Sequence, residues 1–152
     1  MASRARCRGA GLMLALLLAA AYSTCSDPLG GENKPTHVVT LPLPNPLRPG
    51  RYMVYWDGKD KNKQTVAAGA YRCVLDGGTY VGEIQMTAMD GTKGKPADST
   101  GTGTGLWFFE TPAAAYVLEQ NRPEPFYAKD GTNLLFEIPE PSNVVLAIHR
   151  KQ

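Results

Sequence analysis

Short segments in which apolar and polar residues alternate restrict the fold of this chain more than any other feature. In residues 51–56, for example, Tyr52, Val54 and Trp56 occupy every second position. This period of two is typical of β-strands with one buried face. Turn residues such as Asp76-Gly77-Gly78 separate the segments, which favours antiparallel pairing. The sequence predicts an all-β domain with strands at 37–43, 51–56, 70–75, 79–88, 133–139 and 143–150, and a possible strand at 106–110.

Three segments lack a clear period. Residues 89–105 are rich in glycine, threonine and lysine and are predicted to be a linker. Residues 111–120 are compatible with a short helix or an extended packing segment, and residues 121–131 are predicted to be turns. The 16 glycines and 12 prolines of the 152-residue chain make long helices improbable after the leader.

The N-terminus has the layout of a secretory signal peptide. Arg4, Arg6 and Arg8 precede an apolar run from Leu12 to Ala21 that is too short to span a bilayer comfortably. Without residues 1–24, the chain keeps 13 basic and 14 acidic residues, so the formal charge of +2 becomes −1. This balance gives no reason to expect nucleic-acid binding.

The position of Cys25 allows two ways of processing the leader. This cysteine lies shortly after the apolar run, as the lipidated cysteine of a bacterial lipoprotein does, whereas Ala21-Tyr22-Ser23 suits ordinary signal peptidase cleavage. With lipidation, residues 25–35 are a polar tether, and residues 26–35 after the anchor reach at most ~35 Å, at ~3.5 Å per residue. Cys73 is interpreted as a buried, inert thiol, with a Cys25–Cys73 disulfide as the alternative.

Residues 56–69 combine a large aromatic residue with a charged loop. Trp56 is predicted to be in the core, Asp57-Gly58 to start a chain reversal, and Gly69 to let the chain re-enter the sheet. Lys59, Asp60, Lys61, Asn62 and Lys63 form the predicted exposed tip and a candidate interaction site. Lysines occupy positions 3, 5 and 7 of this loop, where an EF-hand has its calcium ligands, so a metal site is not expected.

No set of catalytic groups is recognisable. The two histidines, His37 and His149, fall in predicted strands, and the GTGTG run at 101–105 lacks the lysine of a phosphate-binding loop. Glu137 and Glu140 flank a proline turn without the features of an acid–base pair. The chain is therefore predicted to be neither an enzyme nor a cofactor-binding protein.

Residues 48–86 resemble the second half of the FlgD-type immunoglobulin-like domain, and they are similar to the sorting domains of type IX secretion cargo. The shared features are Pro49-Gly50, then Trp56-Asp57-Gly58, and Ala68-Gly69-Ala70-Tyr71. The family usually has a glycine where Lys63 stands. The resemblance implies an immunoglobulin-like antiparallel β-sandwich of about seven strands over residues 36–150.

Residues 118–150 resemble the first half of the same family, although they come later in this chain. The resemblance rests on Leu118-Glu119-Gln120-Asn121, on Pro123, Pro125 and Phe126, and on two strands joined by a proline turn. It implies a circular permutation with halves 36–88 and 118–150 and a linker at 89–117. A domain-swapped dimer completed by residues 132–150, or an incomplete gene model, are the alternatives.

The expected function is that of a non-catalytic, exported module for protein–protein interaction, adhesion or scaffolding. It would lie in the envelope or at the cell surface as a lipoprotein that touches the membrane only through its anchor, or otherwise be secreted. Its protein or glycan partner would bind the loop at 57–65, an open sheet edge, or Trp107, Phe108 and Phe109 if these are exposed together. For these three residues, burial in the core under the linker is the other interpretation. The alternatives are a type IX secretion cargo or sorting module, and a carbohydrate-binding module with Tyr52, Tyr55 and Tyr80 in an exposed row.

Overall fold

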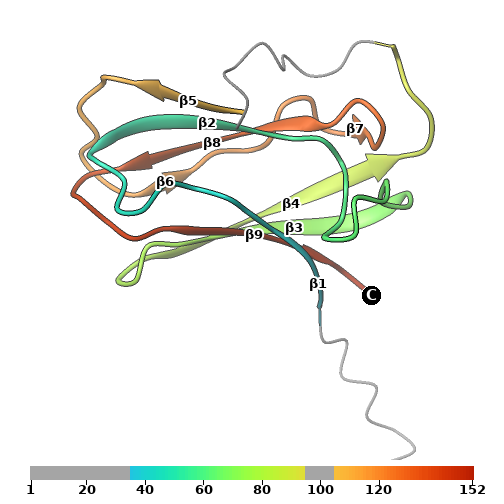
Figure 1. Ribbon diagram of the computed structural model, residues 1–152, viewed down its shortest axis with the longest axis horizontal. Helices are drawn as coiled ribbons and strands as arrows, with labels where there is room; N and C mark the ends of the chain where they lie inside the picture. Colours follow the sequence, from blue (N-terminus) through green and yellow to red (C-terminus); the bar gives the residue numbers. More distant parts are fainter. Residues whose placement is uncertain (1–34, 95–104) are drawn as a thin grey trace, which may run out of the picture. The chain divides into compact units, whose positions relative to one another are not determined.

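Two β-sheets pack face to face, with the apolar sides of their strands turned towards each other (Figure 1). The computed structural model describes residues 35–94 and 105–152. One sheet has the strand order β1 (Thr36–Leu41), β9 (Val145–Arg150), β3 (Gly69–Asp76), β4 (Val81–Met89) and β7 (Phe126–Tyr127). The other has the order β5 (Leu106–Phe109), β2 (Gly50–Trp56), β8 (Thr132–Ile138) and β6 (Val117–Leu118). The described residues contain no helix, so the predicted all-β, immunoglobulin-like sandwich is confirmed.

The strands pair antiparallel except for β4 and β7, which run parallel over two residues. In the five-stranded sheet, the first strand of the domain lies beside the last, and Thr36 of β1 is opposite Arg150 of β9. Figure 1 shows β1 and β9 side by side near the C-terminus. A bulge between His37 and Val39 interrupts their register. Residues far apart in the sequence therefore share one sheet.

Alternation along the strands decides which residues form the core. Every second residue of β2, from Gly50 to Trp56, is buried, and β8 follows the same pattern from Thr132 to Ile138. The side chains between them face outward on the four-stranded sheet. The largest fully buried side chains are Trp56, Tyr71, Phe126, Phe136, Leu75, Met86, Leu134, Ile138, Leu146 and Ile148.

The seven predicted strands all form, with ends that differ by up to two residues from the predicted ones. Two further strands of two residues each, β6 and β7, arise where the sequence predicted an ambiguous segment and turns. Residues 111–120 contain β6 and no helix. Within residues 89–117, which join the two resembling segments, Met89 ends β4 and Leu106–Phe109 form β5. The leader 1–24 and all of the tether 25–35 except Pro35 lie outside the described residues.

Candidate interaction site

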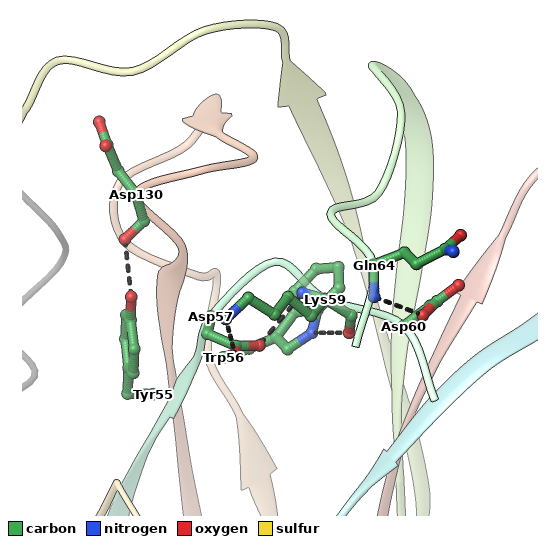
Figure 2. Close-up of polar contacts among 7 residues, drawn as sticks. All are labelled: Tyr55, Trp56, Asp57, Lys59, Asp60, Gln64 and Asp130. Atoms are coloured by element: carbon green, nitrogen blue, oxygen red, sulfur yellow. Dashed lines mark hydrogen bonds and ion pairs between the residues drawn. The ribbon is translucent and has the colours of Figure 1, made fainter. Parts of the chain in front are cut away.

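The loop at 57–65 is ordered by hydrogen bonds from its own backbone to two carboxylates. The N–H of Lys59 donates to Asp57 Oδ1 at 3.1 Å, and the N–H groups of Asn62 and Gln64 donate to Asp60 Oδ1 at 2.8 and 3.0 Å. Figure 2 shows the bonds to Lys59 and Gln64. Lys63 takes a left-handed φ of 65°, in the position where the resembling family has a glycine.

The same loop is fixed to the sandwich at three points. Trp56 Nε1 donates to the Lys59 carbonyl at 2.9 Å, and the Lys61 N–H donates to the Val38 carbonyl at 3.1 Å (Figure 2 shows the first bond). A Cβ at Gly58 (φ 67°) would lie 1.9 Å from the Ala128 carbonyl oxygen, so only glycine fits there. The loop thus covers part of the free edge of β1, and its tip at Lys61, Asn62 and Lys63 is exposed.

The carboxylates of the loop are already engaged. Besides the bonds from backbone N–H groups, the Asp57 Oδ2 atom lies 3.3 Å from Lys59 Nζ. Within the part of the chain that the structure describes, no group of three or more His, Cys, Asp or Glu residues is placed to hold a metal ion. The loop geometry is that of an Asx-type turn, in which the aspartate side chains accept hydrogen bonds from the backbone.

Two open hollows flank the loop. One, of about 340 Å³, is lined by residues of β1, of the loop and of the Tyr71 region, together with Arg150. The other, of about 370 Å³, lies between β1 and the start of the loop and is lined by Leu41, Pro42, Tyr55, Trp56 and Lys59 among others. The loop lysines border these hollows, so the candidate residues Lys59, Asp60, Lys61 and Lys63 are brought to one end of the sandwich.

The residues that carry the family resemblance come together in the core. The Trp56 ring lies 6.1 Å from the Tyr71 ring and 5.5 Å from the Phe126 ring, centroid to centroid. Tyr71 donates from its hydroxyl to the Ala67 carbonyl at 2.7 Å, a bond four residues upstream like the tyrosine corner of immunoglobulin-like sandwiches. Phe126 belongs to the resembling segment 118–150, and Trp56 and Tyr71 belong to the segment 48–86. The two segments therefore share one core.

The prolines and glycines of the resemblance hold the surrounding turns. Pro123 and Pro125 are exposed, and the Pro123 carbonyl accepts hydrogen bonds from Asn121 Nδ2 and Thr132 Oγ1, both at 3.0 Å. Gly69 has a φ of 149°, and a Cβ there would meet the Arg150 guanidinium at 3.6 Å. Asn121 is fully buried and also bonds Thr132, a structural role that the sequence pattern did not reveal.

The three aromatic residues of β5 divide between the two faces of the sheet. Phe108 packs inward on Tyr52 at 5.0 Å, with the Arg48 guanidinium 4.3 Å from its centroid. Trp107 lies opposite Met53, whose side chain faces outward, and Phe109 is 43% exposed. Among the described residues, β5 has β2 as its only strand neighbour, so within this part of the chain its other side is unpaired. The period of two, applied to residues 106–109, would have indicated this division.

The tyrosines named for a carbohydrate platform do not form an exposed row. Tyr52 is buried in the core and stacks on Phe136. Tyr55 lies on the outer face of the four-stranded sheet, where its hydroxyl donates to the Asp130 carbonyl (Figure 2). Burial raises the pKa of Tyr55, and Asp57 and Asp130 raise it further. Tyr80 stacks on Tyr116, with 5.2 Å between the ring centroids.

The cysteine, glutamate and glycine candidates lie apart from one another in the core and at the surface. Cys73 is a free thiol in the core, and burial raises its pKa far above the usual range, so it is unreactive in the folded chain. Its place in the core also disfavours the Cys25–Cys73 disulfide, of which Cys25 lies outside the described residues. Glu137 lies 3.9 Å from Arg51, and Glu140 is 3.5 Å from the Tyr116 hydroxyl. The GTGTG run is described only at Gly105, which accepts a bond from Tyr55 N–H.

His37 and His149 lie opposite each other on β1 and β9. His37 is exposed and His149 is half-buried. Burial lowers the pKa of His149, and the charge of Arg72 and the neighbouring His37 lower it further, against the opposing effect of Glu83.

The described residues form an immunoglobulin-like β-sandwich with an aromatic edge strand, β5, and an ordered, lysine-bearing loop. Comparisons with models of known protein families, with curated proteins and with solved structures find no match to this chain. Residues 35–94 and 105–152 include no helix with the length and apolar character needed to cross a membrane.

Proposed function

We propose that this chain is a non-catalytic, exported interaction module that binds a protein partner along β5. The observation that carries the proposal is the edge of β5 that no described strand covers, where Phe109 is 43% exposed and Trp107 lies on the same outer face. An open strand offers unpaired backbone groups to an extended segment of a partner, and aromatic side chains add apolar contact area. The loop at 57–65 is the secondary surface, because part of it is occupied in covering β1.

We further propose that the domain is a circularly permuted relative of the FlgD-type immunoglobulin-like domain. The packing of Trp56 and Tyr71 with Phe126 supports this, because the residues of both resembling segments meet in one core. So does the position of Thr36 opposite Arg150, since a short turn between these residues would restore the order of the family. The swapped dimer remains the alternative, in which the strands of residues 132–150 would complete a neighbouring chain.

The leader is the basis for proposing export, and Cys25 is the basis for proposing a membrane anchor. We propose that Cys25 is lipidated and that residues 25–35 tether the sandwich to the envelope. With a short tether, the module would act close to the membrane surface, as a scaffold or adhesion module.

Lipidation of Cys25 is expected to make the protein incorporate radioactive palmitate in bacterial cells. The Cys25→Ala variant should lose this label completely, while Cys73→Ala should keep it, because Cys73 lies in the core and carries no acyl chain. Autoradiography of the immunoprecipitated proteins measures the label. Equal labelling of the wild type and Cys25→Ala would remove the lipid anchor from the proposal and leave plain secretion.

A photo-crosslinking residue at position 109 is expected to give a discrete adduct with a partner in the cells that make the protein. The matched control is the same residue at position 81, because Val81 is also an exposed apolar side chain (65%) but belongs to the five-stranded sheet. Immunoblots after irradiation should show at least several-fold more adduct from position 109. Similar yields from both positions, or adducts from position 81 alone, would contradict binding along β5.

A further inference from the structure

The histidines are paired across two neighbouring strands. His37 of β1 is directly opposite His149 of β9, and their ring centroids are 5.4 Å apart. The residues next to them in sequence, Val38 and Ile148, are buried, so both histidines belong to the outer side of the five-stranded sheet. This placement depends on the pairing of the first strand of the domain with the last.

The polar atoms of this pair are incompletely satisfied. His149 Nδ1 is buried and has no hydrogen-bond partner among the described residues. A buried nitrogen without a partner is unfavourable and is rare in folded proteins. His37 is exposed and its Nε2 lies 2.9 Å from Thr40 Oγ1, so its ring can reorient at little cost. The site thus combines one nitrogen in need of a partner with one adaptable imidazole.

The spacing suits a shared metal ion. A divalent ion bound at ~2.0–2.1 Å by one nitrogen of each imidazole holds two ring centroids roughly 5 to 6 Å apart. Imidazole is a preferred ligand of Zn²⁺ and Cu²⁺, and two protein ligands leave positions for water.

The neighbouring charges have both signs, because Arg72 disfavours a positive charge at His149 and Glu83 favours one. Arg72, opposite His149 on β3, is paired with Glu83 at 2.9 Å. Arg150 is directed to the Tyr71 ring, 6.0 Å from its centroid, and not to the outer face. Glu83, Gln85 and Thr87 are the polar residues of β4 on this side, and the Lys151 side chain is exposed.

We propose that His37 and His149 together bind a divalent late transition-metal ion, Zn²⁺ or Cu²⁺, on the outer face of the five-stranded sheet. The ion would hold β1 to β9 near the point where the chain leaves the sandwich. This role is independent of partner binding along β5, which lies on the other sheet.

Calorimetric titration of the chain with ZnCl₂ tests the proposal, and the protein must carry no polyhistidine tag. One ion per chain is expected to bind, and His37→Ala and His149→Ala should each weaken binding by about 100-fold, because loss of one imidazole removes the second, intramolecular contact. Gln85→Ala, on the same face two strands away, is the control and should bind as the wild type does. The electron paramagnetic resonance spectrum with CuSO₄ should show coupling to two imidazole nitrogens.

Zinc should also raise the unfolding midpoint of the wild type and leave that of His37→Ala unchanged, since an ion that bridges the strands binds the folded chain preferentially. Since the His37 side chain is exposed, this variant is expected to fold normally. Equal affinity in the wild type and both histidine variants would overturn the proposal, as would zinc binding with no change in the wild-type midpoint.

Discussion

A chain that lacks residues 132–152 is expected to be unfolded, because the deletion removes an inner strand from each sheet. β8 lies between β2 and β6, and β9 lies between β1 and β3. The deletion also removes fully buried side chains, among them Leu134, Phe136, Ile138, Leu146 and Ile148. At ~1.5–3 kcal/mol for each buried side chain, the loss exceeds about 7 kcal/mol. That is similar to the whole stability of a typical domain, ~5–15 kcal/mol.

Circular dichroism and the dispersion of amide resonances measure this outcome. A chain without Lys151 and Gln152 alone is the control, because both side chains are exposed and the deletion leaves all strands complete. It should remain folded. A soluble product of the longer deletion with dispersed resonances would contradict a sandwich completed by its own C-terminal strands, and it would equally contradict a dimer completed by those of a neighbour.

Trp56→Ala is expected to lower the free energy of unfolding by about 3–5 kcal/mol, the range for large aromatic residues truncated in a core. Trp56 is 1% exposed and contacts aromatic residues of both resembling segments, Tyr71 and Phe126. Its indole N–H also holds the Lys59 carbonyl, so the loop should loosen as well. Urea unfolding followed by circular dichroism gives the free-energy change.

Trp107→Ala is the matched control for this effect, since Trp107 is the other tryptophan of the chain and lies on the outer face of an edge strand. Its removal should cost about 1 kcal/mol or less. A loss of partner binding in Trp107→Ala would then not be explained by a loss of stability. Comparable losses at both positions would mean that Trp56 does not have the central packing role that its burial indicates.

The strands were predictable because each has one buried face and a turn after it. The alternation of residues 51–56 and 70–75 fixed both the strand type and the buried set, including Trp56, Tyr71 and Cys73. The short strands β6 and β7 were not predictable, because two residues carry no period. The parallel pairing of β7 with β4 depends on tertiary packing around Phe126, which local sequence does not encode.

The turns of the candidate site could be predicted from the sequence, but the side of the sheet on which its exposed residues lie could not. Asp57-Gly58 was recognised as a chain reversal, and the side chains of Asp57 and Asp60 accept hydrogen bonds from the loop backbone. The outward position of Trp107 and Phe109 required knowledge of the strand beside β5. The pairing of His37 with His149, 112 positions apart, arises only from the adjacency of β1 and β9.

That adjacency also determines how the sandwich would respond to mechanical load. Any pull on the residues before Thr36 reaches the domain through β1, whose start lies opposite the end of β9. Beyond its pairing with β9, the described part of the chain gives β1 one backbone bond from the loop, from Lys61 to Val38. Force applied at Thr36 is therefore borne by the β1–β9 bonds one after another, as in unzipping. The mechanical strength of the attachment would depend on its first cross-strand pairs, Thr36–Arg150 and His37–His149.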